Sequence, residues 1–408
     1  MKHTRRTGLV ALGATLALTL TACGGGEKEG SSSGTSGGGG EASGETIKIG
    51  VIADMTGATA DVGGPYNRGM LAYVDSVNTA GGLGGSKIEA ISNDYAYEVP
   101  KAEQLYKQYV NDEVVAIQGW GTGDSEALHG KVAQDELPFM SASYAEALTD
   151  PKEAPYNFVV AATYSDQIRV ALNWINKDSG GDAEVAVFHH DSPFGNAPVE
   201  DGKAWIAEKG YKLGYQAYAM PAGSPNYAGL LSQAKSQGAE YIIIQNVASP
   251  AAQVAKDIKA GGMDMKIVCL NWCSNELFIK TAGADVAEGH MMIQPIAPLS
   301  TNKPGHKAIN DYITKKGIKP EDVTVSWVAG WATMEAMAKG ITKAGEGGDL
   351  TGPAIKEALE TMGAIDVGQL IGGETIQFST DSHRGTSSSG VYSVEGGKMV
   401  EVEAPAQP

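Results

Sequence analysis

The stretch IGVIADMTGATADVGGPYNRGMLAYVDSVNTAGGLGGSKIEAISND, residues 49–94, determines the fold class of this chain. Its two ends are short apolar runs rich in isoleucine, and its middle carries apolar residues at helical spacing between residues 66 and 80. Short apolar runs that alternate with helical patterns are typical of parallel strands in a sheet covered on both faces. The stretch therefore predicts a strand at 47–54, a helix at 66–80 and a second strand at 87–94.

The same alternation continues along most of the chain. It predicts two more strands of a first sheet at 114–119 and 137–143, with helices at 100–111 and 125–136. A second series follows, with strands at 183–190, 214–220, 241–245 and 266–271 and helices at 166–177, 197–209, 227–236 and 249–260. Two such series in succession predict an α/β protein made of two doubly wound parallel-sheet lobes.

The last quarter of the chain has too few predicted strands to form a core of its own. It predicts one strand at 290–297, helices at 303–316, 326–344 and 352–361, and short strands near Ile376, Tyr392 and Val400. We expect these pieces to complete the two sheets, so that several chain crossings form a hinge. The predicted division is lobe 1 at 46–160 plus 293–368, and lobe 2 at 161–292 plus 369–403. Ligands of open parallel sheets bind beyond the carboxyl ends of the strands, so two facing edges predict a cleft.

The N-terminus has the layout of an export signal. Lys2, Arg5 and Arg6 precede the apolar run LVALGATLAL, which is too short to span a bilayer, and LTAC at residues 20–23 resembles the bacterial lipobox. This pattern predicts a lipoprotein signal peptide at 1–22 and lipidation of Cys23; an ordinary secreted protein is the alternative. Residues 23–45 are rich in glycine and serine and predict a flexible tether to the membrane.

Charge and length restrict the function classes. The formal net charge is −17, and removal of the signal peptide would take away three positive charges and bring it to −20. Such a charge argues against binding to nucleic acid and against membrane contact other than through the lipid anchor. About 360 residues after the tether suit two lobes rather than one core.

Two loops of the first lobe carry candidate ligand-binding groups. GWGTGDSEAL, residues 119–128, follows a predicted strand and leads into a helix expected to begin at Asp124 or Ser125. Its glycines allow close backbone approach, and Thr122 with the amide of Gly123 would hold a carboxylate, although an ordinary tight turn is the alternative. After the next strand, SASYAEAL offers Ser141, Ser143 and Tyr144. Glu146 has the capping-box spacing from Ser143, so we expect it to cap a helix.

Aromatic side chains recur at the loops that would face the cleft. They are Trp120 in lobe 1 and Tyr164, Phe194 and Trp272 in lobe 2. Several aromatic residues at matching strand ends predict a pocket that encloses a small, partly apolar molecule.

Catalytic and metal-binding patterns are weak. Ser232 and Ser300 each begin an S-x-x-K match, but no K-T-G follows, and G-x-S-x-G, H-E-x-x-H and Walker patterns are absent. His189 and His190 are adjacent, so a strand would direct them to opposite faces. We therefore expect no enzyme, no metal and no cofactor; a serine enzyme acting on the cell wall is the alternative.

The stretch VCLNWCSNE, residues 268–276, contains Cys269 and Cys273 on either side of Trp272. Four extended residues separate alpha carbons by about 13 Å, so a disulfide would require a sharp turn at residues 271–272. The preferred interpretation places Cys269 buried at a strand end and Cys273 beside Trp272 in the pocket wall, with the disulfide left open.

Residues 49–94 together with SASYAEALTD (141–150), ADVAEGHMM (284–292) and HRGTSSSGVYSVEGGKMV (383–400) resemble a known family. It is the extracytoplasmic solute-binding lipoproteins of ABC importers with the type I periplasmic-binding fold, which includes receptors for branched-chain amino acids, amides and urea. The resemblance implies a monomer whose two lobes close on a ligand and deliver it to permease subunits; an amide or urea receptor and a sensory subunit are alternatives.

The resemblance also implies roles for particular residues. The ligand carboxylate would meet Thr122 and a hydroxyl group in 141–144, while lobe 2 would supply Phe194 and the loop 245–248, which includes Asn246. An acidic residue near Trp272 would bind the ligand's ammonium group. LNWCSNE places no carboxylate at that position, so either Glu276 or Asp191 reaches in or the ligand lacks an amine.

Overall fold

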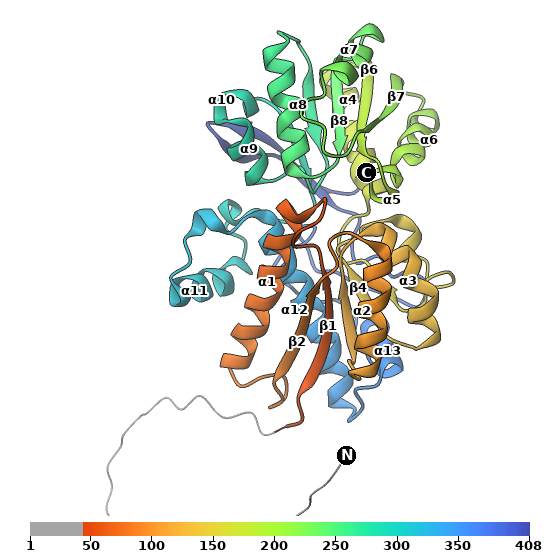
Figure 1. Cartoon of the computed structure of the whole chain (residues 1–408), viewed down its shortest axis with the longest axis vertical. Helices are drawn as coiled ribbons and strands as arrows, with labels where there is room; N and C mark the ends of the chain where they lie inside the picture. The colour runs from red at the N-terminus through yellow and green to blue at the C-terminus, as the bar shows by residue number, and fades with distance from the viewer. Residues whose placement is uncertain (1–43) are drawn as a thin grey trace, which may run out of the picture. The chain divides into compact units, whose positions relative to one another are not determined.

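The structure, a computed structural model, describes residues 44–408 and is shown in Figure 1. The predicted signal peptide, Cys23 and nearly all of the predicted tether lie outside the described residues. Among the residues that are described, no helix is both long and apolar enough to cross a membrane.

Lobe 1 is built on a five-stranded sheet in the order β2-β1-β3-β4-β5, with all of its strands parallel. Its strands are β1 (Ile47–Ala53), β2 (Ile88–Asp94), β3 (Ala116–Gly119), β4 (Phe139–Ser141) and β5 (Asn157–Phe158). Its helices include α1 (Ala60–Thr79), α2 (Val99–Asn111) and α3 (Thr122–Gln134). The strand-helix-strand unit predicted from residues 49–94 is confirmed. Helix α1 begins at Ala60, earlier than predicted, and contains Pro65 near its N-terminus.

Two helices from the last quarter of the chain complete lobe 1. They are α12 (Val325–Glu346), which packs along α1, and α13 (Gly352–Thr361), which packs on α12. The close approach of α1 and α12 depends on Gly69 and Gly330, because a Cβ atom on either would collide with a backbone carbonyl of the other helix. This packing holds α1, whose first turn borders the cleft, against the sheet.

Lobe 2 is built on a seven-stranded sheet in the order β12-β11-β10-β9-β8-β6-β7. Its strands are β6 (Asp182–His190), β7 (Lys212–Met220), β8 (Tyr241–Gln245), β9 (Lys266–Cys269), β10 (Met291–Gln294), β11 (Ser389–Glu395) and β12 (Lys398–Ala406). β11 and β12 are antiparallel, and the other five are parallel. The expectation that the last quarter completes both sheets is wrong in part: β10, β11 and β12 all join lobe 2, and the strand expected near Ile376 is an isolated bridge to Ile365.

Helices cover both faces of the lobe 2 sheet. The alternation along β6 shows this, because Val185 and Val187 belong to a cluster with Ile168 of α4, whereas Ala186 and Phe188 join the core beneath α8. The helices of this lobe are α4 (Tyr164–Asp178), α5 (Pro193–Asn196), α6 (Val199–Lys209), α7 (Ala228–Ser236), α8 (Ala248–Ala260), α9 (Glu276–Ala282) and α10 (Ala284–Ala287). The remaining elements are α11 (His306–Lys316) and three 3₁₀ turns, η1 (Glu146–Thr149), η2 (Leu299–Thr301) and η3 (Pro320–Asp322).

The chain crosses between the sheets after β5, after β10 and before β11, and these crossings are tied together. Val159 pairs with Arg384, and the Arg384 guanidinium donates to Asp166 Oδ1 at 3.1 Å and to Glu146 Oε1 at 2.9 Å. The expectation that Glu146 caps a helix is wrong: η1 has Ala145 at its N-cap and no side-chain cap, and Glu146 forms ion pairs at the crossing. A charged network therefore links lobe 1, lobe 2 and the returning chain.

Candidate functional site

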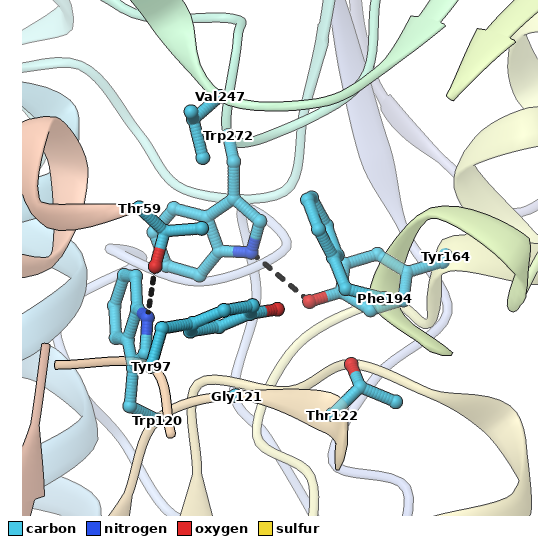
Figure 2. A pocket seen from close by; sticks show the side chains of 9 residues that line it. All are labelled: Thr59, Tyr97, Trp120, Gly121, Thr122, Tyr164, Phe194, Val247 and Trp272. Atoms are coloured by element: carbon cyan, nitrogen blue, oxygen red, sulfur yellow. Dashed lines mark hydrogen bonds between the residues drawn. The ribbon is translucent and has the colours of Figure 1, made fainter. Parts of the chain in front are cut away.

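A cavity lies where the carboxyl edges of the two sheets meet (Figure 2). Every residue that lines it comes after the end of a strand or begins the following helix. The lining residues are Thr59, Tyr97, Trp120, Gly121, Thr122, Tyr164, Phe194, Val247 and Trp272. The cavity contains about 220 Å³ of empty space. The two lobes are thus closed tightly around a narrow space.

The lobe 1 wall, formed by Thr59, Tyr97, Trp120, Gly121 and Thr122, depends on a buried carboxylate. Asp54 follows β1, and its Oδ2 accepts hydrogen bonds from the Thr59 amide at 2.9 Å and the Thr59 hydroxyl at 2.7 Å. Thr59 Oγ1 in turn accepts from Trp120 Nε1 at 2.7 Å, as Figure 2 shows. Asp54 is fully buried, so this chain of bonds fixes the Trp120 indole from behind.

Asp124 supports the same wall at the start of α3. Helix α3 begins at Thr122 with Gly121 as its N-cap, so the expected start at Asp124 or Ser125 is wrong. Asp124 Oδ2 accepts from the Gly121 amide at 3.2 Å, and Oδ1 accepts from the Tyr95 hydroxyl at 2.8 Å. The helix begins early because the Asp124 side chain satisfies an amide just ahead of its first turn. Burial raises the pKa of Asp124 to about 7.

Tyr97 reaches the cavity from a strained turn. Ala96 and Tyr97 have φ of 53° and 59°, a left-handed conformation uncommon for residues other than glycine. Asp94 stabilises this turn by accepting from the Ala96 amide at 3.0 Å. The Tyr97 ring packs edge-on against His190 of lobe 2 at 5.8 Å between ring centroids. Strain of this kind concentrates at functional sites, and here it brings an aromatic ring across the cleft.

A cluster of hydroxyl groups lies at one end of the cavity. The Thr122 and Ser143 hydroxyl oxygens are 2.8 Å apart, and Ser141 Oγ accepts from the Ser143 amide at 3.2 Å. Tyr164 donates to the Ala142 carbonyl at 3.3 Å, and its burial raises its pKa to about 12. These groups remain neutral and can both donate and accept hydrogen bonds.

The lobe 2 wall, formed by Tyr164, Phe194, Val247 and Trp272, depends mainly on aromatic packing. The Trp272 ring stacks on Tyr144 with centroids 5.6 Å apart and lies 5.0 Å from Trp120. Its Nε1 donates to the Tyr164 hydroxyl at 3.0 Å, and Phe194 packs edge-on against Tyr164 at 5.3 Å. Trp272 therefore touches side chains from both lobes.

The structure brings half of the predicted site residues to the cavity surface and places the other half behind it. Those at the surface are Trp120, Thr122, Tyr164, Phe194 and Trp272. Those that do not line it are Gly123, Ser141, Ser143, Tyr144 and Asn246. Gly123 faces Pro193 across the cleft, and Asn246 accepts from the Val247 amide at 2.8 Å. A role in ligand binding stays a prediction for all ten.

Sequence reasoning missed Thr59 and Tyr97, and it selected the loops that contain Gly121 and Val247 without naming these two residues. Tyr97 and Val247 follow β2 and β8 by a few residues, so the rule that selected Trp272 at a strand end applies to them also. Thr59 gave no comparable signal, because its place depends on the hydrogen bonds to Asp54.

The two cysteines lie on a sharp turn. The Leu270 carbonyl accepts from the Cys273 amide at 3.1 Å and from the Ser274 amide at 2.9 Å, so the chain reverses where a disulfide would require it. Both cysteines are nevertheless free and fully buried. The expectation that Cys273 belongs to the pocket wall is wrong: it does not line the cavity, and its thiol donates to the Ile244 carbonyl at 3.1 Å.

The residues of the enzyme alternative lie away from the cavity. Ser232 is exposed on α7, and Ser300 is exposed in η2. Within residues 44–408, no cluster of histidine, cysteine, aspartate and glutamate side chains could hold a metal ion.

Comparison with known proteins gives a consistent result. The chain matches the family model described as periplasmic binding protein over residues 46–398. It is 25% identical over 304 residues to the leucine-, isoleucine-, valine-, threonine-, and alanine-binding protein of Pseudomonas aeruginosa, covering 74% of this chain and 79% of that protein.

Solved structures agree in fold. A branched-chain amino acid ABC transporter protein from Thermus thermophilus with bound valine superposes with a TM-score of 0.83 at 25% identity, over 89% of this chain and 97% of that one. A fatty acid ABC transporter substrate-binding protein from Thermomonospora curvata gives 0.80 at 21% identity, over 89% and 93%, which shows the fold alone. The predicted fold class is confirmed. Because the family match spans well over half of its length, the chain belongs to the periplasmic binding protein family of extracytoplasmic solute-binding proteins.

Proposed function

We propose that this protein is the solute-binding component of an ABC importer, which captures a small organic solute between its lobes and delivers it to a membrane permease. The observation that carries the proposal is the cavity itself, whose wall combines strand-end residues of two separate sheets. A site divided in this way binds fully only when the lobes are closed.

Closure would couple binding to recognition by the permease. A solute that contacts Trp120 and Thr122 on one lobe and Phe194 and Trp272 on the other favours the closed state by the difference in its affinity for the two states. The permease can then distinguish the loaded receptor from the empty one. The names of the relatives support this role, since the Pseudomonas protein binds branched-chain amino acids and the Thermus protein was solved with valine.

The proposed location is the outer face of the cell membrane, with Cys23 lipidated after removal of residues 1–22. The export signal and the lipobox-like LTAC support this location. The variant Cys23→Ser should release the protein from the membrane fraction, whereas Cys269→Ser should leave it there; retention of Cys23→Ser would contradict the anchor.

A thermal-shift and calorimetry screen tests the function. The mature chain with Cys23→Ser is mixed with branched-chain amino acids, short carboxylic acids, aromatic acids, amides and urea. A ligand at a hundred times its Kd stabilises the folded state by about 2.7 kcal/mol, which a melting curve detects. In small-angle scattering, the radius of gyration of the protein with bound solute should be no larger than that of the protein alone. No heat and no shift from any member of the set would overturn the proposal.

A further inference from the structure

The wall of the cavity carries no charge. The nine residues that line it contribute aromatic rings, hydroxyl groups, one valine and one glycine, and none of these described side chains is a carboxylate, a lysine, an arginine or a histidine. An ammonium group on the solute would therefore have no carboxylate in direct contact, whereas a carboxylate on the solute would be held by neutral donors such as the Thr122 hydroxyl.

The two carboxylates nearest the wall are already occupied by protein donors. Asp54 accepts from the Gly57 amide at 2.6 Å as well as from both donors of Thr59, and it is fully buried. Asp124 accepts from Gly121 and Tyr95 and is 1% exposed, and burial raises its pKa to about 7. Neither presents a free oxygen to the cavity, and neither lines it.

The carboxylates that could reach in from elsewhere do not do so. Glu276 accepts from the Val325 amide at 2.8 Å and lines a separate hollow of about 1130 Å³ beside η2 and η3. Asp191 is exposed at the end of β6. Asp61 does not line the cavity: its Oδ2 accepts from the Ser249 amide of α8 at 2.8 Å, and its Oδ1 is buried with no hydrogen-bond partner among the described residues.

We propose that the solute is a small branched aliphatic or aromatic molecule without an ammonium group, which ends in a carboxylate or a carboxamide. This inference rests on the proposed function. An ammonium group enclosed by this wall would lose its hydration without gaining a counter-charge, which costs several kcal/mol. An apolar body, by contrast, gains from contact with Trp120, Trp272 and Phe194.

The hydroxyl cluster can bind the polar end of such a solute. Thr122 and Tyr164 line the cavity, and Ser143 lies directly behind Thr122. The Thr122 hydroxyl can rotate to donate to an oxygen of a carboxylate or to the oxygen of an amide, whereas the Tyr164 hydroxyl donates to the Ala142 carbonyl and accepts from Trp272. The narrow space requires a small solute, so short acids and amides fit this chemistry.

Matched pairs of ligands that differ only in the amine test the inference. The first set is leucine, 4-methylpentanoate and 4-methylpentanamide; the second is phenylalanine, 3-phenylpropanoate and 3-phenylpropanamide. Calorimetry with the mature Cys23→Ser chain should give a Kd for the acid or the amide that is lower by about 100-fold or more than that of the amino acid. The acid and amide arms decide which polar end is bound.

The outcomes separate the inference from the proposed function. Leucine or phenylalanine binding as tightly as its partners without the amine would overturn the inference and leave the receptor role intact. In that case, loss of leucine binding in Asp61→Ala would assign the missing charge to Asp61. Absence of binding by every member of both sets, together with a hit elsewhere in the broad screen, would overturn the inference alone. Absence of any hit would overturn both.

A pair of variants provides a second test. Val247 lines the cavity and is the N-cap residue of α8, a position where aspartate and asparagine are both favoured. Val247→Asp would add a carboxylate to the wall, and Val247→Asn has the same shape without the charge. The ratio of leucine affinity to 4-methylpentanoate affinity should rise by about tenfold or more in Val247→Asp relative to Val247→Asn. An equal ratio in two folded variants would contradict the inference.

Discussion

The two walls of the cavity place a tryptophan at the same kind of position but hold it by different means. Trp120 follows β3, and a chain of hydrogen bonds through Thr59 to the buried Asp54 fixes its indole. Trp272 follows β9 and is held mainly by stacking on Tyr144. The lobe 1 wall is thus an extension of a buried polar network, whereas Trp272 of the lobe 2 wall packs in an aromatic cluster to which lobe 1 contributes Tyr144 and Trp120.

This difference predicts that equivalent mutations act on different properties. A buried polar network is costly to break because each orphaned donor loses its partner in a place that water cannot reach. Aromatic side chains that border a cavity contact the bound solute. Truncating one should therefore lower ligand affinity more than it lowers the free energy of unfolding. Lobe 1 mutations should lower stability first, and lobe 2 mutations should lower binding first.

The largest effect is expected from Asp54→Ala. It removes the acceptor for the Gly57 amide and for both donors of Thr59, so the free energy of unfolding should fall by about 3–5 kcal/mol. Urea unfolding followed by circular dichroism measures the loss. Glu89→Ala, an exposed acid on β2, is the matched control and should change little. A loss below about 1 kcal/mol would mean that the lobe 1 wall does not depend on this network.

The second effect is a pH dependence specific to Asp124. Its pKa is raised by burial to about 7 from an ordinary value of 3.8. Between these values the folded state binds the proton more tightly than the unfolded chain, so the free energy of unfolding falls as the pH rises. The fall is at most about 4 kcal/mol, complete near pH 7 and absent below about pH 4.

Asp124→Asn isolates this contribution, because the variant has no proton to lose at that position. The free energy of unfolding of the parent minus that of the variant should decrease from pH 4 to pH 7 in urea titrations. A flat difference, or one that increases with pH, would show that Asp124 is ionised throughout and that the lobe 1 wall has a negative charge behind it. An ionised Asp124 behind the wall would also weaken binding of a solute that carries a carboxylate.

The third effect tests the lobe 2 wall. Trp272→Ala removes the ring that contacts Tyr144 and Trp120 and the donor to Tyr164. Affinity for the tightest ligand of the matched sets should fall by about 2–4 kcal/mol in calorimetry. Trp272→Phe keeps a ring and loses the donor, so about 1 kcal/mol is expected. Trp205→Ala, which removes an indole far from the cavity, should leave the affinity unchanged; a loss as large as that of Trp272→Ala would point to a general defect.

The same contrast explains what could be predicted from the sequence. The period and the length of the apolar runs were sufficient to predict the order of strands and helices. Burial on both faces of a parallel sheet requires nearly continuous apolar strands, and these are easy to recognise in a sequence. Trp272 and Phe194 were found because an aromatic residue at a strand end is visible in sequence. The packing of α12 in lobe 1 could not be predicted from the sequence. It depends on contact between small residues of α1 and α12, such as Gly69 and Gly330, which 260 residues of chain separate.

Thr59 is the missed residue that no local rule could select, because a specific hydrogen bond places it. Thr59 lines the cavity because Asp54 binds it, and no local pattern encodes a bond between a strand end and a loop. Glu146 had the spacing of a capping residue, but the guanidinium of Arg384, distant in sequence, offers a stronger charged partner than a helix amide. Sequence reasoning therefore identified the apolar half of the site better than its polar half.

The smallest expected effect concerns the contact that joins the walls outside the cavity. Asp61 at the start of α1 in lobe 1 accepts a hydrogen bond from the Ser249 amide at the start of α8 in lobe 2. A carboxylate at a helix N-terminus stabilises the contact, so Asp61→Ala should weaken closure and reduce ligand affinity by about 1 kcal/mol, or roughly fivefold. Since the contact lies outside the cavity wall, acids, amides and amino acids should all be weakened by the same factor, and the urea midpoint should hardly change.

The control is Asp285→Ala, an exposed acid on α10 with no partner among the described side chains, which should bind as the parent does. Calorimetry across the matched sets distinguishes two roles for Asp61. A uniform loss identifies a contact between lobes, which acts on the closed state alone. A loss confined to leucine and phenylalanine would identify Asp61 as the partner of an ammonium group, and the comparison between the walls would then have to include a charge on the lobe 1 side.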